Sequence, residues 1–263
     1  MAEQRDETTW RRSGDAWVIG WGGDDWTLGF VDGRYGLRGG RGGGERLVLR
    51  GLAATGRRDG HVFTPESLVG VESFHSRVLA TFEPAGWNGL TVRAAWGPCR
   101  DGRGLDLEVQ ASTSTVGELR RMEVLVGTRS GPDGARERRR FVTARDRASA
   151  GMSYDGRETA ETLAVLETLP VAGPGRPLLF QPTDSPSAYL EFVHPEDFSR
   201  VVVETVEGTA TDVEYALFGY DLEKGVVLRG RLRGVWLPGA TTPEAADEEC
   251  RLFLHEPPPL RTS

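Results

Sequence analysis

Apolar and polar side chains alternate most regularly between residues 71 and 127. In three consecutive runs, apolar residues occupy every second position (one parity) and mostly polar residues occupy the positions between them (the other parity). In the first run the apolar residues are Phe74, Val78, Ala80 and Phe82, and the polar ones are His75, Arg77 and Thr81. In the second run Leu90, Val92, Ala94 and Trp96 alternate with Thr91 and Arg93, and in the third Leu105, Leu107, Val109 and Ala111 alternate with Asp106, Glu108, Gln110 and Ser112. A period of two is that of strands with one face on a core and one in water. The region therefore predicts antiparallel strands, followed by another at 121–127.

The turns between these runs also predict a register. The pairing that brings the apolar side chains onto one face sets Phe82 opposite Leu90 and Gly97 opposite Gly104. On the other face it sets Arg93 opposite Glu108, with Arg77 across Ala95. A slip of one residue would mix the two faces, so the pattern favours this register.

The rest of the chain is typical of short strands separated by turns. Strands are expected at 17–21, 26–31, 47–49, 163–169, 189–193, 201–206, 212–220, 226–236 and 251–255. The glycine-rich segment 36–44 is expected to be a mobile loop, and 174–186 a loop-rich connection. A Thr-Pro-Glu sequence at 64–66 and another at 242–244 predict short helical turns, the second ending near residue 249. With about fourteen strands, the chain is expected to be an all-β protein, a large antiparallel β-sandwich with one or two short helical turns.

Length and composition favour a single domain. The 263 residues fit one large β domain, which we expect at 16–256, after a frayed N-terminus (1–15) and before a proline-rich tail (257–263). The net charge of −7 argues against a dedicated nucleic-acid binder. No apolar run is long enough to span a membrane, no secretory signal is visible, and two cysteines make no disulfide framework. The expected location is the cytoplasm.

Motifs for established chemistries are missing. The sequence has no phosphate loop, no zinc-ligand spacing and no nucleophile elbow, so we expect neither a cofactor nor a metal. His75 lies on the polar parity beside Arg77, where it is a candidate acid or base or a solvated surface residue. His194 shares its parity with Leu190 and Phe192, and is a candidate of the same kind or a partly buried, hydrogen-bonded histidine. The basic run Arg136–Arg140 indicates an exposed loop or an anion contact.

Trp87, between Gly86 and Asn88, is the best candidate for an exposed aromatic platform. An exposed indole beside charged groups is how many proteins hold sugars, because the ring stacks on C–H faces while the charged groups bind hydroxyls. The alternative is that Trp87 folds over the edge of its own hairpin.

The segments FHSRVLATFEPAGWNGLTVRAAW, GLDLEVQASTSTVGELRRMEVLVG and YLEFVHPEDFSRVVVE resemble the strands of the galactose mutarotase-like super-sandwich. This resemblance implies sugar binding on the concave polar face of the larger sheet, where the epimerases use a histidine and a carboxylate. The epimerases' asparagine-histidine loop and their paired catalytic histidines are absent. By the resemblance, the polar face of 71–112 becomes the candidate site.

Two functions therefore stand side by side. The first is a carbohydrate-binding or carbohydrate-active protein with a saccharide as its partner. Its candidate site has His75 and His194 as catalytic residues, and Arg77, Trp87, Arg93, Asp106 and Glu108 as binding residues. The alternative is a non-enzymatic β-sandwich module or subunit that binds a protein partner. No residue pattern decides whether the chain is an enzyme.

Overall fold

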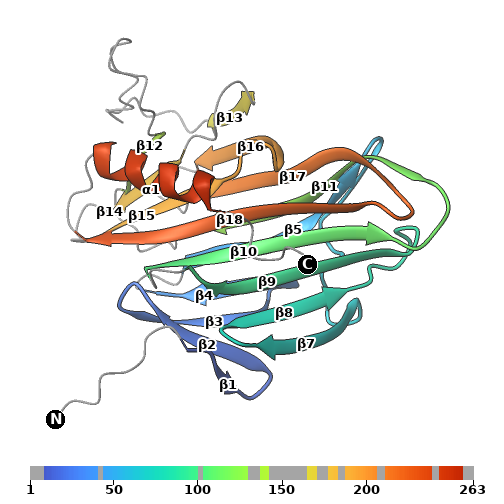
Figure 1. The fold of residues 1–263 in the computed structure, drawn as a ribbon, viewed down its shortest axis with the longest axis horizontal. Helices are drawn as coiled ribbons and strands as arrows, with labels where there is room; N and C mark the ends of the chain where they lie inside the picture. Colours follow the sequence, from blue (N-terminus) through green and yellow to red (C-terminus); the bar gives the residue numbers. More distant parts are fainter. Residues whose placement is uncertain are drawn as a thin grey trace.

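A computed structural model describes residues 9–40, 44–99, 103–129, 137–141, 165–170, 177–182, 187–205, 211–238 and 243–256. These residues form two antiparallel sheets stacked face to face, and one helix (Figure 1). The expected all-β sandwich is confirmed. The expectations for residues 1–8 and for the tail at 257–263 lie outside the described residues. The basic run 136–140 was expected to be an exposed loop, but residues 137–140 lie in a strand, Glu137–Phe141, and residue 136 is outside the described residues.

The ten-stranded sheet has the order β1-β2-β3-β4-β5-β11-β17-β16-β13, with β6 paired to β5. Its strands are β1 (Arg11–Ser13), β2 (Ala16–Trp21), β3 (Asp24–Val31), β4 (Arg34–Gly39), β5 (Gly44–Ala54), β6 (Arg57–Asp59), β11 (Glu118–Arg129), β13 (Val165–Pro170), β16 (Phe198–Thr205) and β17 (Thr211–Glu223).

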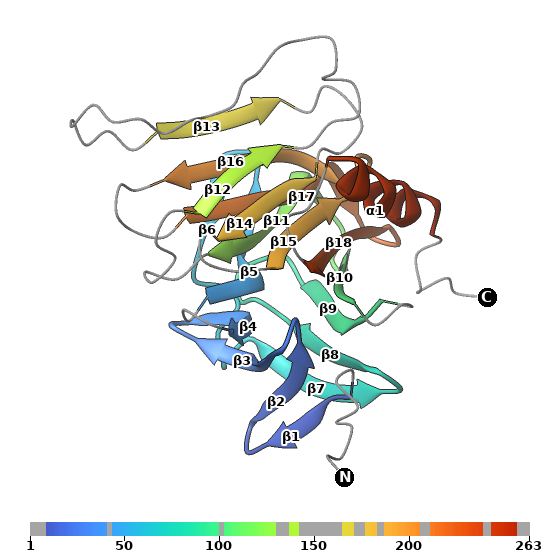
Figure 2. The same ribbon diagram turned by 90° about the vertical axis from the view of Figure 1, so that its left-hand side faces the viewer.

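The eight-stranded sheet has the order β12-β14-β15-β18-β10-β9-β8-β7. Its strands are β7 (Leu68–Phe74), β8 (Arg77–Phe82), β9 (Leu90–Pro98), β10 (Gly104–Thr113), β12 (Glu137–Phe141), β14 (Leu178–Pro182), β15 (Ser187–Val193) and β18 (Val227–Pro238). Figure 2 shows the two layers from a second side.

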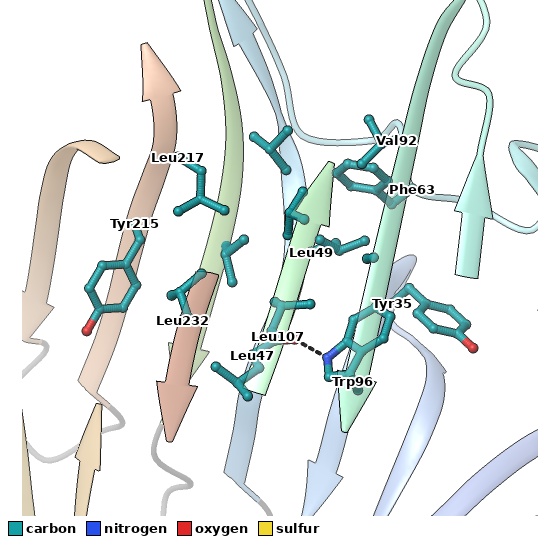
Figure 3. Close-up of a cluster of buried hydrophobic side chains, with 14 of the residues drawn as sticks. Tyr35, Leu47, Leu49, Phe63, Val92, Trp96, Leu107, Tyr215, Leu217 and Leu232 are labelled. Carbon is teal, nitrogen blue, oxygen red and sulfur yellow. Dashed lines mark hydrogen bonds between the residues drawn. The ribbon is translucent and has the colours of Figure 1, made fainter. Parts of the chain in front are cut away.

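The core fills the space between the two sheets. Leu47 and Leu49 point into it from β5, and Trp96 and Leu107 point into it from the other sheet (Figure 3). The Trp96 indole nitrogen donates a hydrogen bond of 3.0 Å to the Leu47 carbonyl, which joins the two sheets directly. The apolar parity of β8, β9 and β10 therefore faces the core, as the alternation predicted.

The predicted register of these strands is wrong by two residues. Phe82 pairs with Val92 and not with Leu90, and Leu105 pairs with Pro98. A shift of two residues leaves every side chain on its face, so the alternation could not distinguish the two registers. The predicted Arg93–Glu108 pair is lost as a result, because Arg93 lies opposite Gln110.

The side chain of Phe74 does not point into the core as those of Val78, Ala80 and Phe82 do. His75 and Ser76 form a tight turn between β7 and β8, with Phe74 opposite Arg77, and His75 adopts a positive φ of 53°. The reversal leaves Phe74 68% exposed.

The glycine-rich segment is not a loop over the residues that the structure describes. Residues 34–39 form β4, and β5 begins at Gly44. A Cβ atom on Gly36 would lie 2.5 Å from the Cα atom of Val48 on the neighbouring strand. The glycines here permit close backbone packing in a sheet. Likewise, the predicted connection at 174–186 contains β14.

The C-terminal segment is helical and not a strand. Helix α1 (Pro243–His255) begins at the proline that the sequence placed at its first position and continues through the segment expected as a strand. Ala246 and Phe253 on one face of α1 pack against Leu190 and Phe192 on the outer side of β15. Both views place α1 beside β15 and β18 (Figures 1 and 2). No helix in the described parts of the chain is long and apolar enough to cross a membrane. The other predicted helical turn is a turn, with a hydrogen bond of 3.1 Å from the Ser67 amide to the Thr64 carbonyl.

In the N-terminal segment, Arg11–Ser13 form strand β1. β1 pairs with β2, and the buried Trp10 donates a hydrogen bond of 3.1 Å from its indole to the Ser76 carbonyl. This contact joins the edge of one sheet to the β7–β8 turn of the other.

Candidate functional site

The outer face of the eight-stranded sheet carries the charged residues that the sequence singled out. Glu108 is buried and accepts a hydrogen bond of 2.7 Å from Arg77, whose side chain passes over Gly97. Burial raises the pKa of Glu108, although Arg77 opposes this shift. Arg93 is exposed on the same face.

Asp106 on this face is held by Arg233 of β18. The Arg233 guanidinium donates two hydrogen bonds to the Asp106 carboxylate, at 2.6 and 2.9 Å, and also binds Glu256 just after α1. Burial lowers the pKa of Arg233, but its hydrogen bonds to Asp106 outweigh burial and raise it overall. Arg231 donates to the carbonyl of Phe253 at 2.9 Å. The predicted polar face is thus largely a network of satisfied ion pairs, partly covered by α1.

The two candidate catalytic histidines are far apart. His75 lies in the β7–β8 turn against the ring of Phe74, at 4.1 Å between ring centroids. His194 follows β15, and its Nδ1 accepts a hydrogen bond of 3.4 Å from the Glu196 amide. Strands β18, β10 and β9 lie between them. The structure therefore does not bring His75 and His194 together in one site.

Trp87 is fully buried, so the prediction of an exposed stacking platform is wrong. The guanidinium carbon of Arg57 lies 3.8 Å from the centre of the Trp87 ring. Nη1 of the same guanidinium donates a hydrogen bond of 2.8 Å to the Gly86 carbonyl. Trp87 belongs to the main core cluster between the sheets.

A second polar cluster lies inside the sandwich. The Glu191 carboxylate is buried and accepts hydrogen bonds from Thr128 at 2.7 Å and from Tyr189 and Tyr215 at 3.2 Å each. Arg46 of the opposite sheet lies 4.8 Å from the ring of Tyr189. Burial raises the pKa of Glu191, and its hydroxyl donors and Arg46 oppose this shift. This cluster is buried and connects the two sheets.

The outer face of the ten-stranded sheet carries a different arrangement, centred on Glu123 of β11. Ser199 donates a hydrogen bond of 2.6 Å to one carboxylate oxygen of Glu123, and Arg200 donates one of 3.0 Å to the other. Both donors come from β16, whereas β17 separates β16 from β11. The side chains therefore meet over β17.

Two further arginines cross the same face. Arg50 of β5 lies flat over Gly127 and forms an ion pair with Asp212 of β17. A Cβ atom at position 127 would overlap the Arg50 side chain, so a larger residue there would displace Arg50 from its present position. Arg58 of β6 forms an ion pair of 2.7 Å with Glu214 of β17.

The Arg58–Glu214 contact shows that this face is concave. β5 and β11 lie between β6 and β17. Along the strand direction, Arg58 is level with Glu123 of β11, whereas Glu214 is level with Gly127 of β11, so the two partners are also offset along the strands. On a flat sheet the two Cα atoms would be about 19 Å apart. Their side chains can meet only because the sheet curls toward its outer side.

This outer face also carries a small apolar cluster, which we call its floor. Ala53, Leu125 and Ala216 form a cluster on this outer face, separate from the main core, and are 8%, 1% and 1% exposed. We call the floor together with its three ion pairs the bridged face; its members are Arg50, Ala53, Arg58, Glu123, Leu125, Ser199, Arg200, Asp212, Glu214 and Ala216.

Backbone irregularities gather beside the bridged face. The β11–β17 pairing shifts register next to Glu123, and the non-glycine residues Arg121 and Phe218 have positive φ angles of 50° and 80°. The β5–β11 pairing shifts beside Leu125. Bulges and left-handed non-glycine residues cluster at functional sites. The pairings among β8, β9, β10 and β18 show no such shifts.

The chemistry available on the bridged face is hydrogen bonding and charge. Among the described residues no group of three or more histidine, cysteine or acidic side chains is arranged to hold a metal ion. The five strands of this face contribute no histidine. Sequence reasoning missed this site because its residues come from five strands whose order the alternation does not reveal.

No family model matches the chain, and no curated protein matches it. Solved structures do match. A GalM/aldose epimerase homologue from C. elegans is 10% identical with a TM-score of 0.52, over 88% of this chain and 99% of that one. A provisionally assigned aldose 1-epimerase from Klebsiella pneumoniae is 10% identical with a TM-score of 0.50, over 96% and 90%. A protein from Synechocystis is 14% identical with a TM-score of 0.50, over 85% and 91%.

At such identities the likeness concerns the fold alone. The similar structures are matched over nearly their whole length, so the agreement covers the full two-sheet arrangement and not one hairpin. This chain has the galactose mutarotase-like sandwich fold.

Proposed function

We propose that the protein binds a saccharide on the bridged face without opening its ring. The observation that carries this proposal is the combination of an apolar cluster with flanking charged donors and acceptors on one face. Leu125 and Ala216, each 1% exposed, are apolar residues that would pack against the C–H face of a sugar once they are uncovered. Glu123 and Arg200 offer an acceptor and donors for its hydroxyls. The mutarotase-like fold supports the same class of ligand.

The absence of acid–base groups favours binding over epimerisation. An epimerase must exchange protons with the ring oxygen and the anomeric hydroxyl, which requires side chains free to give and take a proton. Here each described carboxylate of the face is engaged by an arginine, and the strands of the face contribute no histidine.

The test is calorimetric titration of the protein with a panel of mono- and oligosaccharides. Glu123→Gln and Ser199→Ala should each weaken binding about tenfold or more, since a lost hydrogen bond to a charged group costs about 1.5–3 kcal/mol. Arg93→Ala is the matched control, because Arg93 is an exposed arginine on the outer face of the other sheet. We expect it to bind as the wild type does.

Three outcomes would contradict the proposal. Binding of no sugar at millimolar concentration would reject a saccharide ligand. Loss of binding in Arg93→Ala with retention in Glu123→Gln would move the site to the face that the sequence suggested. Acceleration of anomer exchange, followed by NMR, would show ring-opening catalysis and reject a purely binding role.

A non-enzymatic interaction module remains the second candidate. It is favoured by two exposed apolar residues on the edge strand β7, Val69 and Phe74, which are 60% and 68% exposed. Edge strands that expose apolar side chains are sites of association with other chains. Sedimentation of the protein alone and with cell extract fractions would detect such a complex.

A further inference from the structure

The Arg58–Glu214 ion pair spans two strands of the bridged face. Arg58 belongs to β6, a three-residue strand paired only with β5, and it reaches over β5 and β11 to Glu214. Leu125 lies on β11, one of the two strands that this pair crosses, and Ala216 lies on β17, the strand of Glu214; each is only 1% exposed although both are on an outer face. A ligand cannot contact these two residues while they are covered.

The two partners of this ion pair differ in their surroundings. The side chain of Arg58 is 56% exposed, whereas that of Glu214 is 16% exposed. Water can rehydrate the exposed guanidinium when the pair opens, so most of the cost of opening falls on the less exposed Glu214 carboxylate. A ligand that donates a hydrogen bond to Glu214 would offset that cost.

We propose that Arg58 and Glu214 form a gate over the floor of the bridged face, and that a ligand enters only when this ion pair opens. The proposal rests on the proposed function for its ligand, a saccharide. In the open state the Glu214 carboxylate accepts a hydrogen bond from the ligand in place of Arg58, and Arg58 turns into solvent.

The gate makes a prediction that needs no ligand. Hydroxyl-radical footprinting read by mass spectrometry measures how accessible Leu125 is in solution. Arg58→Ala removes the gate and should raise the labelling rate of Leu125 about threefold or more, a factor within the range of a surface ion pair. Glu214→Gln should raise it as well. High salt should raise it in the wild type, because salt screens the pair.

Arg11→Ala is the matched control. Arg11 forms an exposed ion pair of 3.2 Å with Asp25 at the far edge of the same sheet, so its removal should leave the labelling of Leu125 unchanged. Unchanged labelling in both Arg58→Ala and Glu214→Gln would overturn the gate. Since two different variants report on it, a folding defect in one leaves the test decisive.

Titration with the sugar panel separates this proposal from the proposed function. If the gate controls entry, a saccharide that binds the wild type should bind Arg58→Ala more tightly, because no ion pair has to be broken. Equal or weaker binding by Arg58→Ala would overturn the gate while leaving the proposed function standing. If no sugar binds either protein but footprinting shows the gate, the proposed function fails and the opening motion stands.

Discussion

At the scale of single residues, polar groups inside the sandwich are held by specific partners. Glu191 is the least exposed of the buried acidic residues described here, and its carboxylate is surrounded by three hydroxyl donors from β11, β15 and β17. Arg46 approaches it from β5 across the rings of Tyr189 and Phe180. Buried polar groups are tolerated when their hydrogen bonds are satisfied, and the Glu191 carboxylate meets that condition.

Glu191 should make the stability of the protein depend on pH. Its pKa is raised in the folded state, chiefly by burial, so the folded protein holds this proton more tightly than the unfolded chain does. The contribution of Glu191 to the free energy of unfolding is therefore largest below the ordinary glutamate pKa of 4.5, and falls as pH rises through the interval up to the folded pKa. Glu191→Gln should remove this fall.

The measurement is urea unfolding of the wild type and of Glu191→Gln at several pH values between about 4 and 8. The difference in unfolding free energy should move in favour of the variant as pH rises. Thr128→Val keeps the carboxyl and removes one of its donors, so it should retain the dependence seen in the wild type. A difference that stays constant with pH would contradict the predicted role of Glu191.

At the scale of elements, local sequence signals located most strands but could not identify α1 in full. The Thr-Pro-Glu start of the helix was recognisable, whereas the apolar residues of 251–255 are equally compatible with a strand. A tertiary contact of Phe253 favours the helix over the strand, because its ring stacks on Phe192 with centroids 5.7 Å apart and planes at 21°. Arg231 lies 4.3 Å from the centre of the same ring.

Phe253→Ala should therefore detach α1 from the outer side of β15. Truncating a buried phenylalanine costs about 3–5 kcal/mol, and urea unfolding with far-ultraviolet circular dichroism would measure both the stability and the loss of helix. Leu252→Ala is the control, since Leu252 precedes it in the same helix but is 43% exposed. A cost for Phe253→Ala no larger than that for Leu252→Ala would show that the helix does not depend on this contact.

The register of β8, β9 and β10 illustrates the same limit within a sheet. The alternation correctly placed Val92 and Val109 on the core face, yet their partners differ by two residues from those expected. Which side chains of a strand face the core can be predicted from the sequence of that strand alone. Register depends on the length of each loop, and the loop before β9 is occupied by the buried Trp87.

At the scale of the whole molecule, tryptophan indoles join one sheet to the other. Trp96 donates to the Leu47 carbonyl at 3.0 Å, and Trp21 donates to the Arg103 carbonyl at 3.2 Å. Each bond pairs a backbone carbonyl of one layer with a side chain of the other. These contacts fix how the layers are aligned, which nonpolar packing alone specifies less sharply.

Trp96→Phe should destabilise the protein more than Trp87→Phe. Both indoles are fully buried, but the Nε1 of Trp87 has no acceptor among the described residues, whereas that of Trp96 is bonded to Leu47. Losing that bond leaves a buried carbonyl without its partner, at a cost of about 1–3 kcal/mol. Chemical denaturation of the two variants measures the difference, and equal destabilisation would argue against a role for the inter-sheet bond.

The amino-acid sequence by itself determined that the chain is an all-β sandwich, which face of each patterned strand is buried, and the fold that its strands resemble. These follow from alternation and turn residues, which act over a few neighbours in the chain. Only the tertiary structure decided the order of the strands, their register, the burial of Trp87 and the meeting of Glu123 with Ser199 and Arg200. Such contacts depend on loop lengths and on the curvature of a whole sheet, because residues distant in sequence meet only after the strands have been ordered.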